Sequence, residues 1–333
     1  RYIGDWSSDV CSSDLIEMAT YQTYQSIGNR EDLSDVIYDI SPTDTPLLNT
    51  LARAKATAVY HEWQTDSLAS ATTANAAVEG ADASDATMSP TTRLGNYTQI
   101  VQKTIKISGT LESVDKAGRK SEKAYQLSKA SAELKRDIET ILTANQGRSA
   151  GDASTARTMG AMLSWIKTNT SKSSGTTAGV DPTTIGVSTR TDGTQRAFTE
   201  TILKDVIQKV YSSGGNPKIL MVGPFQKQAV SAFAGIAAQR YMAPANEPTT
   251  IIGAADVYMS DFGVLSCVPS RFMRTRDALV IDPEYAAVAY LRPFATNELA
   301  KAGDAEKTQI LAELTLEMRN EAAHGIAADL STS

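Results

Sequence analysis

Histidine and cysteine, the side chains that most often hold metals or carry nucleophilic chemistry, are scarce in this sequence. The 333 residues include two His and two Cys, and His61 and His324 lie near opposite ends of the chain. A catalytic zinc site needs three protein ligands. The counts therefore nearly exclude zinc clusters, Cys/His proteases and disulfide scaffolds. We expect each histidine to pack or to hydrogen-bond at the end of a strand.

Two short motifs match parts of catalytic signatures but lack the rest. Asp261-Phe262-Gly263 matches the metal-binding tripeptide of kinases, yet no glycine-rich phosphate loop, strand lysine or His-Arg-Asp element accompanies it. Ser164-Trp165-Ile166-Lys167 fits S-x-x-K without its partner motifs. We interpret the first as a hairpin turn with Gly263 at positive φ and the second as a chance match. No catalytic residue, cofactor or metal site is predicted.

Charge and composition narrow the class of protein further. Lys and Arg total 32 against 38 Asp and Glu, a formal net charge of −6 that argues against a dedicated nucleic-acid binder. Hydrophobic residues make up 41% and charged residues 21%, which is typical of a folded chain with a real core. The sequence contains no run of about 18 apolar residues, so no membrane partner is predicted.

Residues 1–17 differ from the rest of the chain. They hold Cys11, and their SSDVCSSDL segment resembles translated sequencing-adapter read-through. They lack the charged start and apolar stretch of a secretory signal. We expect 1–17 to be a non-native leader and the native protein to begin at Met18, which would leave Cys267 as its one cysteine.

The first third predicts two short helical patterns and then a long excursion. Residues 31–53 carry apolar residues at helical spacing, interrupted by the Pro-containing segment 41–46. Residues 58–65 and 96–107 alternate as strands. Between them, Asp66–Thr92 contains eight Ala, five Thr and four Ser but no Lys or Arg. Such a segment cannot bury enough apolar area to fold alone, so we expect a long hairpin excursion with a functional tip.

Residues Thr110 to Gly147 predict a long amphipathic helix, because the segment lacks proline and Gly147 stands where a C-terminal cap belongs. Seven basic and six acidic residues mix on its polar side, a pattern of either a solvated face or pairing between chains. A helix of about 30 residues, about 45 Å long, is expected to lie across a sheet or another chain. The predicted apolar stripe comprises Ala124, Leu127, Ser131, Leu134, Ile138 and Ile141.

The remaining sequence mixes short helices with strands. Helices are predicted at 158–167, at 199–212 and from Pro224 to about residue 234. The clearest strand is 308–319, where apolar and polar residues alternate. This order predicts an α+β class with antiparallel strands. The other predicted strands are 218–222, 256–259, 264–268, 278–281 and 286–291.

The order of these elements resembles the major capsid proteins of tailed bacteriophages, which have the Hong Kong 97-like fold. The resemblance covers Met18 to Ser333 and includes three local phrases. The phrases are DLSDVIYDISPTDTPLLNTL, TARTMGAMLSWI and ELTLEMRNEAAHGIAADL.

The resemblance implies a division of the chain into an arm, a loop and two domains. It implies an N-terminal arm at 18–56 and an extended loop at 57–108. A peripheral domain would combine 109–196 with 291–333 and contain a spine helix at 112–147. An axial domain would occupy 197–290.

The resemblance also implies a function in assembly. The chain would be a structural subunit, not an enzyme, that self-assembles into hexamers and pentamers of an icosahedral shell around a double-stranded DNA phage genome. Assembly would take place in the bacterial host cytoplasm, and the mature location would be the virion. Candidate contacts between chains join excursion carboxylates to spine-helix cations. They are Asp66, Glu79, Asp82, Asp85, Lys116, Arg119, Lys120 and Lys123.

The expected partners follow from the same resemblance. Some relatives carry a scaffolding segment before the arm, for which a start at Met18 leaves no room, so we expect a separate scaffolding protein or none. A portal and decoration proteins are further expected partners, with packaged DNA as a non-specific neighbour.

Two alternatives stay open at the level of sequence. The same fold could build an encapsulin-like protein compartment, which neighbouring genes would distinguish from a phage head. An unrecognised hydrolase using Ser or Asp/Glu would instead require one deep pocket with perturbed carboxylates.

Overall fold

The computed structural model describes residues 43–332 except 81, 83–84 and 234–255. The expected leader 1–17 and most of the expected arm 18–56 lie outside these residues. Residues 1–39 and 115–120 form one unit and the remainder of the chain another. Of the first unit only 115–120 is described, a non-helical connection with Gly118 at φ +74°. All elements below belong to the second unit, which mixes helices and sheets as the α+β class requires.

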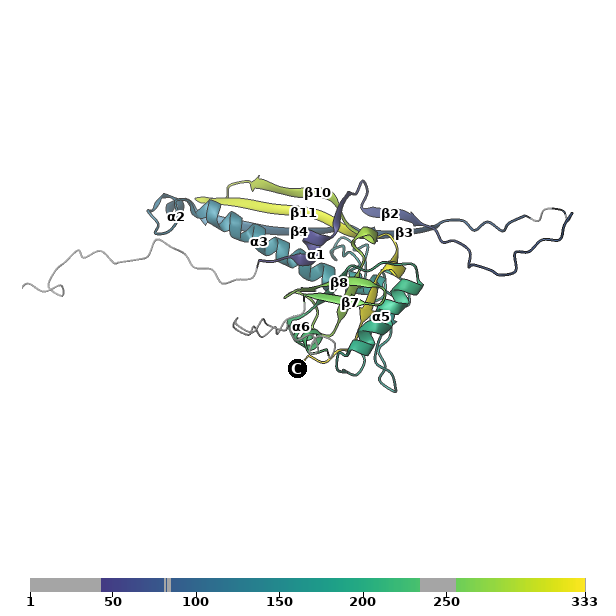
Figure 1. Cartoon of the computed structure of the whole chain (residues 1–333). Helices are drawn as coiled ribbons and strands as arrows, with labels where there is room; N and C mark the ends of the chain where they lie inside the picture. Colours follow the sequence, from purple (N-terminus) through teal and green to yellow (C-terminus); the bar gives the residue numbers. More distant parts are fainter. Residues whose placement is uncertain (1–42, 81, 83–84, 234–255, 333) are drawn as a thin grey trace, which may run out of the picture. The chain divides into compact units, whose positions relative to one another are not determined.

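The larger unit contains a long four-stranded sheet in the order β1-β10-β11-β4. The predicted strand 308–319 is the C-terminal part of β11, and its apolar face from Ile310 to Met318 is buried. Figure 1 shows α3 lying along this sheet. The strands are β1 (Ala52–Lys55), β4 (Gln99–Ser108), β10 (Ala286–Leu299) and β11 (Ala305–Met318).

The spine helix is shorter than the predicted 112–147. The chain forms a short α2 (Gly109–Ser113), leaves helical geometry, and starts α3 (Glu122–Thr143). The break has a capping reason: Ser121 Oγ accepts from Ala124 N at 3.2 Å, and a Glu112 carboxylate oxygen accepts from Glu122 N at 3.0 Å. These groups satisfy amides that a continuous helix would bond internally.

The C-terminal end of the spine helix also differs from the prediction. The helix stops at Thr143, four residues before Gly147. Gly147 is required for close packing instead of capping, because a Cβ there would lie 1.9 Å from the Val187 carbonyl oxygen. The buried stripe is centred on Ala130, Leu134, Ile138 and Leu142.

The predicted strand 96–107 is divided between two sheets. β2 (Tyr60–Thr65) pairs antiparallel with β3 (Thr92–Tyr97) in a two-stranded ribbon. The chain then passes through buried Thr98 and continues as β4, which pairs with β11. The ribbon therefore has a separate base that rests on the long sheet.

A six-stranded sheet in the order β5-β12-β9-β6-β8-β7 forms the second half of the unit. Its strands are β5 (Thr170–Ser171), β6 (Ile219–Val222), β7 (Val257–Ser260), β8 (Gly263–Pro269), β9 (Ala278–Ile281) and β12 (Gly325–Ala327). The predicted axial domain 197–290 supplies four of these strands. β5 and β12 come from segments assigned to the peripheral domain, so the predicted boundary cuts through this sheet.

The remaining helices are short, except for α5. The helix predicted at 158–167 reduces to α4 (Met162–Trp165), all of it buried. α5 (Glu200–Ser212) packs an apolar face on the six-stranded sheet, with Leu203, Val206, Ile207 and Val210 buried. The others are α1 (Pro46–Thr50), α6 (Pro224–Ser231) and the 3₁₀ turns Pro283–Tyr285 and Glu321–Ala323.

Candidate functional site

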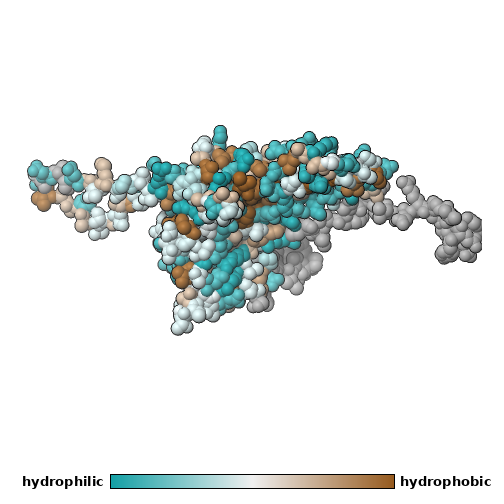
Figure 2. All heavy atoms as spheres, turned by 180° about the vertical axis from the view of Figure 1, so that it is seen from behind, coloured by the Kyte–Doolittle hydropathy of each residue, from teal (hydrophilic) through white to brown (hydrophobic). Residues whose placement is uncertain are grey.

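The excursion between β2 and β3 is the most exposed part of the described chain. All of its described side chains are exposed, and Leu68, Val78 and Met88 are 98%, 79% and 92% exposed. In Figure 2 the excursion, at the left, shows hydrophobic spheres between polar ones. The described residues of this segment form no helix or strand and include no buried side chain.

The four carboxylates that were predicted to contact another chain all belong to the excursion. Asp66, Glu79, Asp82 and Asp85 are all exposed, and within the described residues none of them forms an ion pair. Asp66 Oδ1 accepts a local hydrogen bond from Ser67 N at 2.8 Å. These groups are therefore available to a partner, although their pairing with cations of another chain stays a prediction.

The four predicted cations belong to two segments of the chain. Lys116, Arg119 and Lys120 belong to the connection 115–120, whereas Lys123 is on the first turn of α3. Lys123 Nζ already pairs within the chain, 2.8 Å from Glu298 Oε1 and 3.2 Å from Glu306 Oε2. The structure thus assigns Lys123 to binding the β10–β11 hairpin to the helix.

The root of the excursion is fixed by Asn96, which is fully buried. Its amide donates to Gly160 O at 3.0 Å and to Leu316 O at 2.8 Å, while its carbonyl accepts from Gly160 N at 2.8 Å. This single side chain connects β3, the segment before α4 and β11. No local sequence pattern predicts this role, because the partners lie 64 and 220 positions away.

Aromatic rings and one histidine complete the root. Trp63 packs on Trp165 with ring centroids 5.3 Å apart, and the Arg148 guanidinium lies 5.8 Å from the Trp165 ring. Arg148 also donates to the Gly95 carbonyl. His61 Nε2 lies 3.1 Å from Glu317 Oε2 on β11. Together these contacts hold the β2–β3 ribbon on the long sheet.

A buried carboxylate lies next to the root. Glu313 of β11 accepts from Thr98 Oγ1 at 2.7 Å, from Arg157 at 2.6 Å and from Arg292 Nε at 2.7 Å. A buried carboxylate charge is stable only when it is paired and hydrogen-bonded, and here two guanidinium groups pair with it. Arg292 stands at a register shift in β10, so the cluster joins the bend of that strand to the start of β4.

A second buried carboxylate anchors α1 to the spine helix. Glu139 of α3 accepts from Leu47 N at 2.9 Å and from Leu48 N at 2.8 Å, the free amides at the start of α1. Burial raises the pKa of Glu139, and the two amide bonds oppose that rise. The N-terminal segment therefore enters the fold at a defined point on α3.

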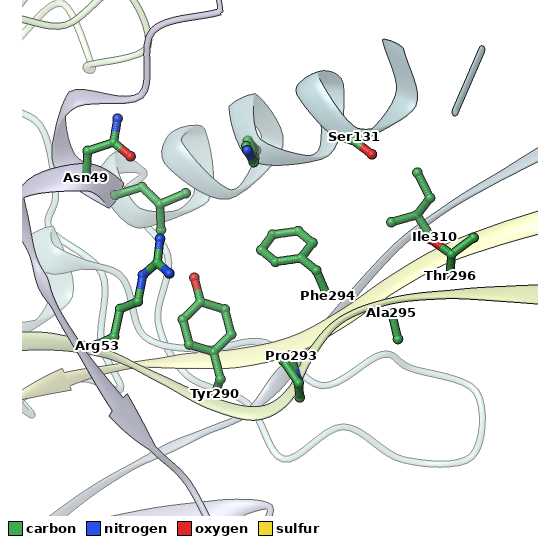
Figure 3. A pocket seen from close by; sticks show the side chains of 11 residues that line it. Asn49, Arg53, Ser131, Tyr290, Pro293, Phe294, Ala295, Thr296 and Ile310 are labelled. Atoms are coloured by element: carbon green, nitrogen blue, oxygen red, sulfur yellow. The ribbon is translucent and has the colours of Figure 1, made fainter. Parts of the chain in front are cut away.

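A groove of about 560 Å³ lies between α1, α3 and the bend of β10. Figure 3 shows Phe294 and Tyr290 on its β10 side, Ser131 on α3 and Arg53 at one end. Burial raises the pKa of Tyr290, and the positive charge of Arg53 opposes this rise. The lining is Leu48, Asn49, Arg53, Ser131, Lys135, Tyr290, Pro293, Phe294, Ala295, Thr296 and Ile310.

The residues tested for catalytic or metal chemistry have structural roles. Buried His324 accepts from Asp282 N through Nδ1 at 3.3 Å, and burial lowers its pKa to about 4. The predicted hairpin turn is confirmed, since Gly263 has φ +141° and closes the β7–β8 connection. Ser164 is buried and donates to Ala161 O.

The described residues contain no group of three or more His, Cys, Asp or Glu side chains placed to hold a metal ion. None of the helices in this part of the chain has the length and hydropathy needed to span a bilayer.

Comparisons with known proteins agree on one family and one fold. A family model described as SU10 major capsid protein matches residues 18–331. The major capsid protein of Escherichia phage Phieco32 is 26% identical over 348 residues, covering 92% of this chain and 96% of that protein. The capsid of cyanophage A-1(L) superposes with a TM-score of 0.64 at 11% identity, covering 94% of this chain and 99% of that chain.

An encapsulin also shares the fold. The encapsulin of Synechococcus elongatus superposes with a TM-score of 0.51 at 10% identity, covering 92% of this chain and 93% of that chain. The fold is therefore shared by phage capsids and encapsulins. The family match is what distinguishes a phage capsid protein from an encapsulin here.

Proposed function

Because this chain belongs to the SU10 major capsid protein family, we propose that its copies assemble as hexamers and pentamers into an icosahedral shell around a double-stranded DNA genome. The chain is a major capsid protein of a bacteriophage, a structural component of the virion with the Hong Kong 97-like fold. Assembly would take place in the host cytoplasm.

The excursion at 66–91 is the observation that supports assembly through intersubunit contacts. Its described residues are all exposed, while its root is bound to the body by Asn96, Trp63 and His61. Because the root is held by the body of its own chain and the exposed segment is not, the exposed segment can contact a neighbouring subunit. Each exposed ion pair would contribute only about 0–1 kcal/mol, but such terms repeat in every copy of a closed shell.

The predicted pairing between chains is retained. Asp66, Glu79, Asp82 and Asp85 would contact cations of a neighbour, for which Lys116, Arg119 and Lys120 stay candidates. Lys123 stays a candidate as well, and a neighbour's carboxylate would join or replace Glu298 and Glu306, which it binds in its own chain.

The division into an arm at 18–56, a loop at 57–108, a peripheral domain and an axial domain is likewise a proposal. The peripheral domain would contain α3 as its spine, and the axial domain would be centred on the six-stranded sheet. A separate scaffolding protein, a portal and decoration proteins would be partners, with DNA as a non-specific neighbour and no catalytic activity.

Electron microscopy of the protein expressed from Met18, with and without a scaffolding protein from the same genome, tests this function. Shells or capsomers are expected. A folded monomer under every assembly condition would contradict the proposal. Terminase and portal genes beside the coding sequence would favour a phage head. A neighbouring gene for a single cargo enzyme would favour an encapsulin-like compartment.

A further inference from the structure

The groove between α1, α3 and the bend of β10 gathers polar side chains that have no partner within the described residues. None of these side chains forms an ion pair or a side-chain hydrogen bond there. They come from α1, β1, α3 and β10, which are distant from one another in the sequence. Polar groups that converge on a concave surface are typical of a ligand site. They are Asn49, Arg53, Ser131, Lys135, Tyr290 and Thr296.

The lining of the groove carries positive charge and no negative charge. Arg53 and Lys135 are exposed, and the lining contains no Asp or Glu. Burial raises the pKa of Tyr290, so its hydroxyl keeps its proton at neutral pH and can donate a hydrogen bond. An occupant is therefore expected to carry an anionic group, which Arg and Lys bind through charge-assisted hydrogen bonds.

Two aromatic rings form the β10 side of the groove. The ring centroids of Tyr290 and Phe294 are 6.2 Å apart, and Phe294 is 39% exposed. Figure 3 shows the Tyr290 hydroxyl directed towards Arg53, whose positive charge acts on it. A planar apolar ring could pack on these two rings while an anionic group reaches the cations.

The size of the groove fits a small organic molecule. Its volume is about 560 Å³. Sites for such ligands measure about 300–1,000 Å³ and combine apolar walls with a few polar groups that fix the orientation of the ligand. Leu48, Pro293 and Ile310 add apolar surface to the two rings.

We propose that this groove binds a small aromatic anion, a planar ring that carries a carboxylate or phosphate group. The ring packs on Phe294, and the anionic group accepts from Arg53 and Lys135. This inference concerns a single subunit and does not depend on the proposed assembly. No sequence motif predicts the site, because its residues come from four separate elements.

Isothermal titration calorimetry of the unassembled subunit, expressed from Met18, tests the proposal. The probes are 2-naphthoate and 2-naphthyl phosphate, and neutral 2-naphthamide has the same ring without the charge. At least one anion should bind roughly tenfold more tightly than the amide, because only the anions can pair with the two cations. The tighter anion identifies the preferred group. Equal affinity of the three probes, or no binding, would overturn the inference.

Substitutions locate the bound probe. Arg53→Met with Lys135→Met should remove the preference for the anion, and Phe294→Ala should weaken binding of all three probes several-fold. Lys55→Met with Lys129→Met is the matched control, because it removes one exposed cation of β1 and one of α3 outside the groove, and it should leave the affinities unchanged.

The substituted positions are all exposed, so the variants should keep the fold, which circular dichroism checks. Equal loss of affinity in the two double variants would assign the effect to net charge and overturn the inference. Whether the unmodified chain forms shells is measured separately and decides only the proposed function.

Discussion

Asn96 shows how much one buried amide can determine. Asn96→Ala would remove three hydrogen bonds and take this partner from Gly160 N and from the Leu316 carbonyl inside the protein, whereas Gly160 O keeps its bond from Trp165 Nε1 at 3.2 Å. Unpaired buried groups are costly, so the free energy of unfolding should fall by about 2–4 kcal/mol. Urea denaturation of the unassembled subunit measures this change.

Asn75→Ala is the matched control for Asn96→Ala. It removes the same side chain from an exposed position of the excursion, where a change within about 0.5 kcal/mol is expected. Equal effects of the two substitutions would show that the Asn96 bonds contribute nothing specific.

His324 makes stability depend on pH. Burial lowers its pKa from 6.5 to about 4, so the folded protein keeps the ring neutral where the unfolded chain binds a proton. The free energy of unfolding should therefore fall as the pH drops from about 6.5 towards 4, by at most about 3 kcal/mol. His324→Asn keeps an acceptor and should flatten this dependence. Parallel curves of denaturation midpoint against pH for both proteins would refute the assignment.

Asp277 should have the opposite effect over nearly the same range. Burial raises its pKa from 3.8 to about 6, although Arg274 opposes this rise. The folded state then binds more protons than the unfolded chain between these values, so stability falls as the pH rises through them. Asp277→Asn should steepen the loss of stability in acid, in contrast to His324→Asn, in the same denaturation series. An unchanged slope would contradict the raised pKa.

Sequence could identify the exposed charges but not the buried ones. The excursion carboxylates stand out because no Lys or Arg occurs among them. Glu313 and Glu139 look like ordinary helix or strand carboxylates, and only tertiary structure brings Arg157 and the Leu47 amide to them. The pairing of Lys123 with Glu298 of β10 and Glu306 of β11 likewise depends on tertiary structure, and its predicted contact with another chain stays a prediction.

At the scale of elements, the excursion can be separated from the fold. Thr65 pairs with Thr92 at the end of the ribbon, so an Asn-Gly turn can replace 66–91 and close a two-residue hairpin. The shortened protein should melt within a few degrees of the parent, as measured by circular dichroism, but should not form shells by electron microscopy.

Loss of folding in the shortened protein would assign the excursion a structural role instead. The control keeps an excursion of the same length and charge by replacing residues 66–91 with a shuffled sequence of the same composition. Shells formed by the Asn-Gly protein would contradict an assembly role for the excursion.

Periodicity predicted the existence of most elements and misplaced several ends. The 3.6-residue pattern identified α3 and α5, and alternation identified β11. The ends depend on groups distant in sequence or space: Glu112 caps α3, and Val187 approaches Gly147. The split at Thr98 depends on its buried bond to Glu313. A single alternating pattern cannot reveal a change of sheet.

At the scale of the molecule, the C-terminal residues complete the second sheet. β12 lies between β5 and β9, and Leu330 is fully buried. Deleting 325–333 should therefore abolish the cooperative thermal transition, because a central strand is lost. Deleting 332–333 is the matched control and should leave the transition in place. A folded protein after the larger deletion would show that β12 is dispensable.

The rigid root of the excursion turns a small angle into a large displacement. About 13 residues on each side of the tip can reach about 40 Å, so once a neighbour holds the excursion extended, a rotation of about 10° at the root would move the tip by about 7 Å. The contacts of Asn96, Trp63 and His61 together set this angle. In a closed shell that angle would set the spacing of neighbours and with it the local curvature. Substitutions at the root that leave the protein folded are expected to change the diameter of the particles.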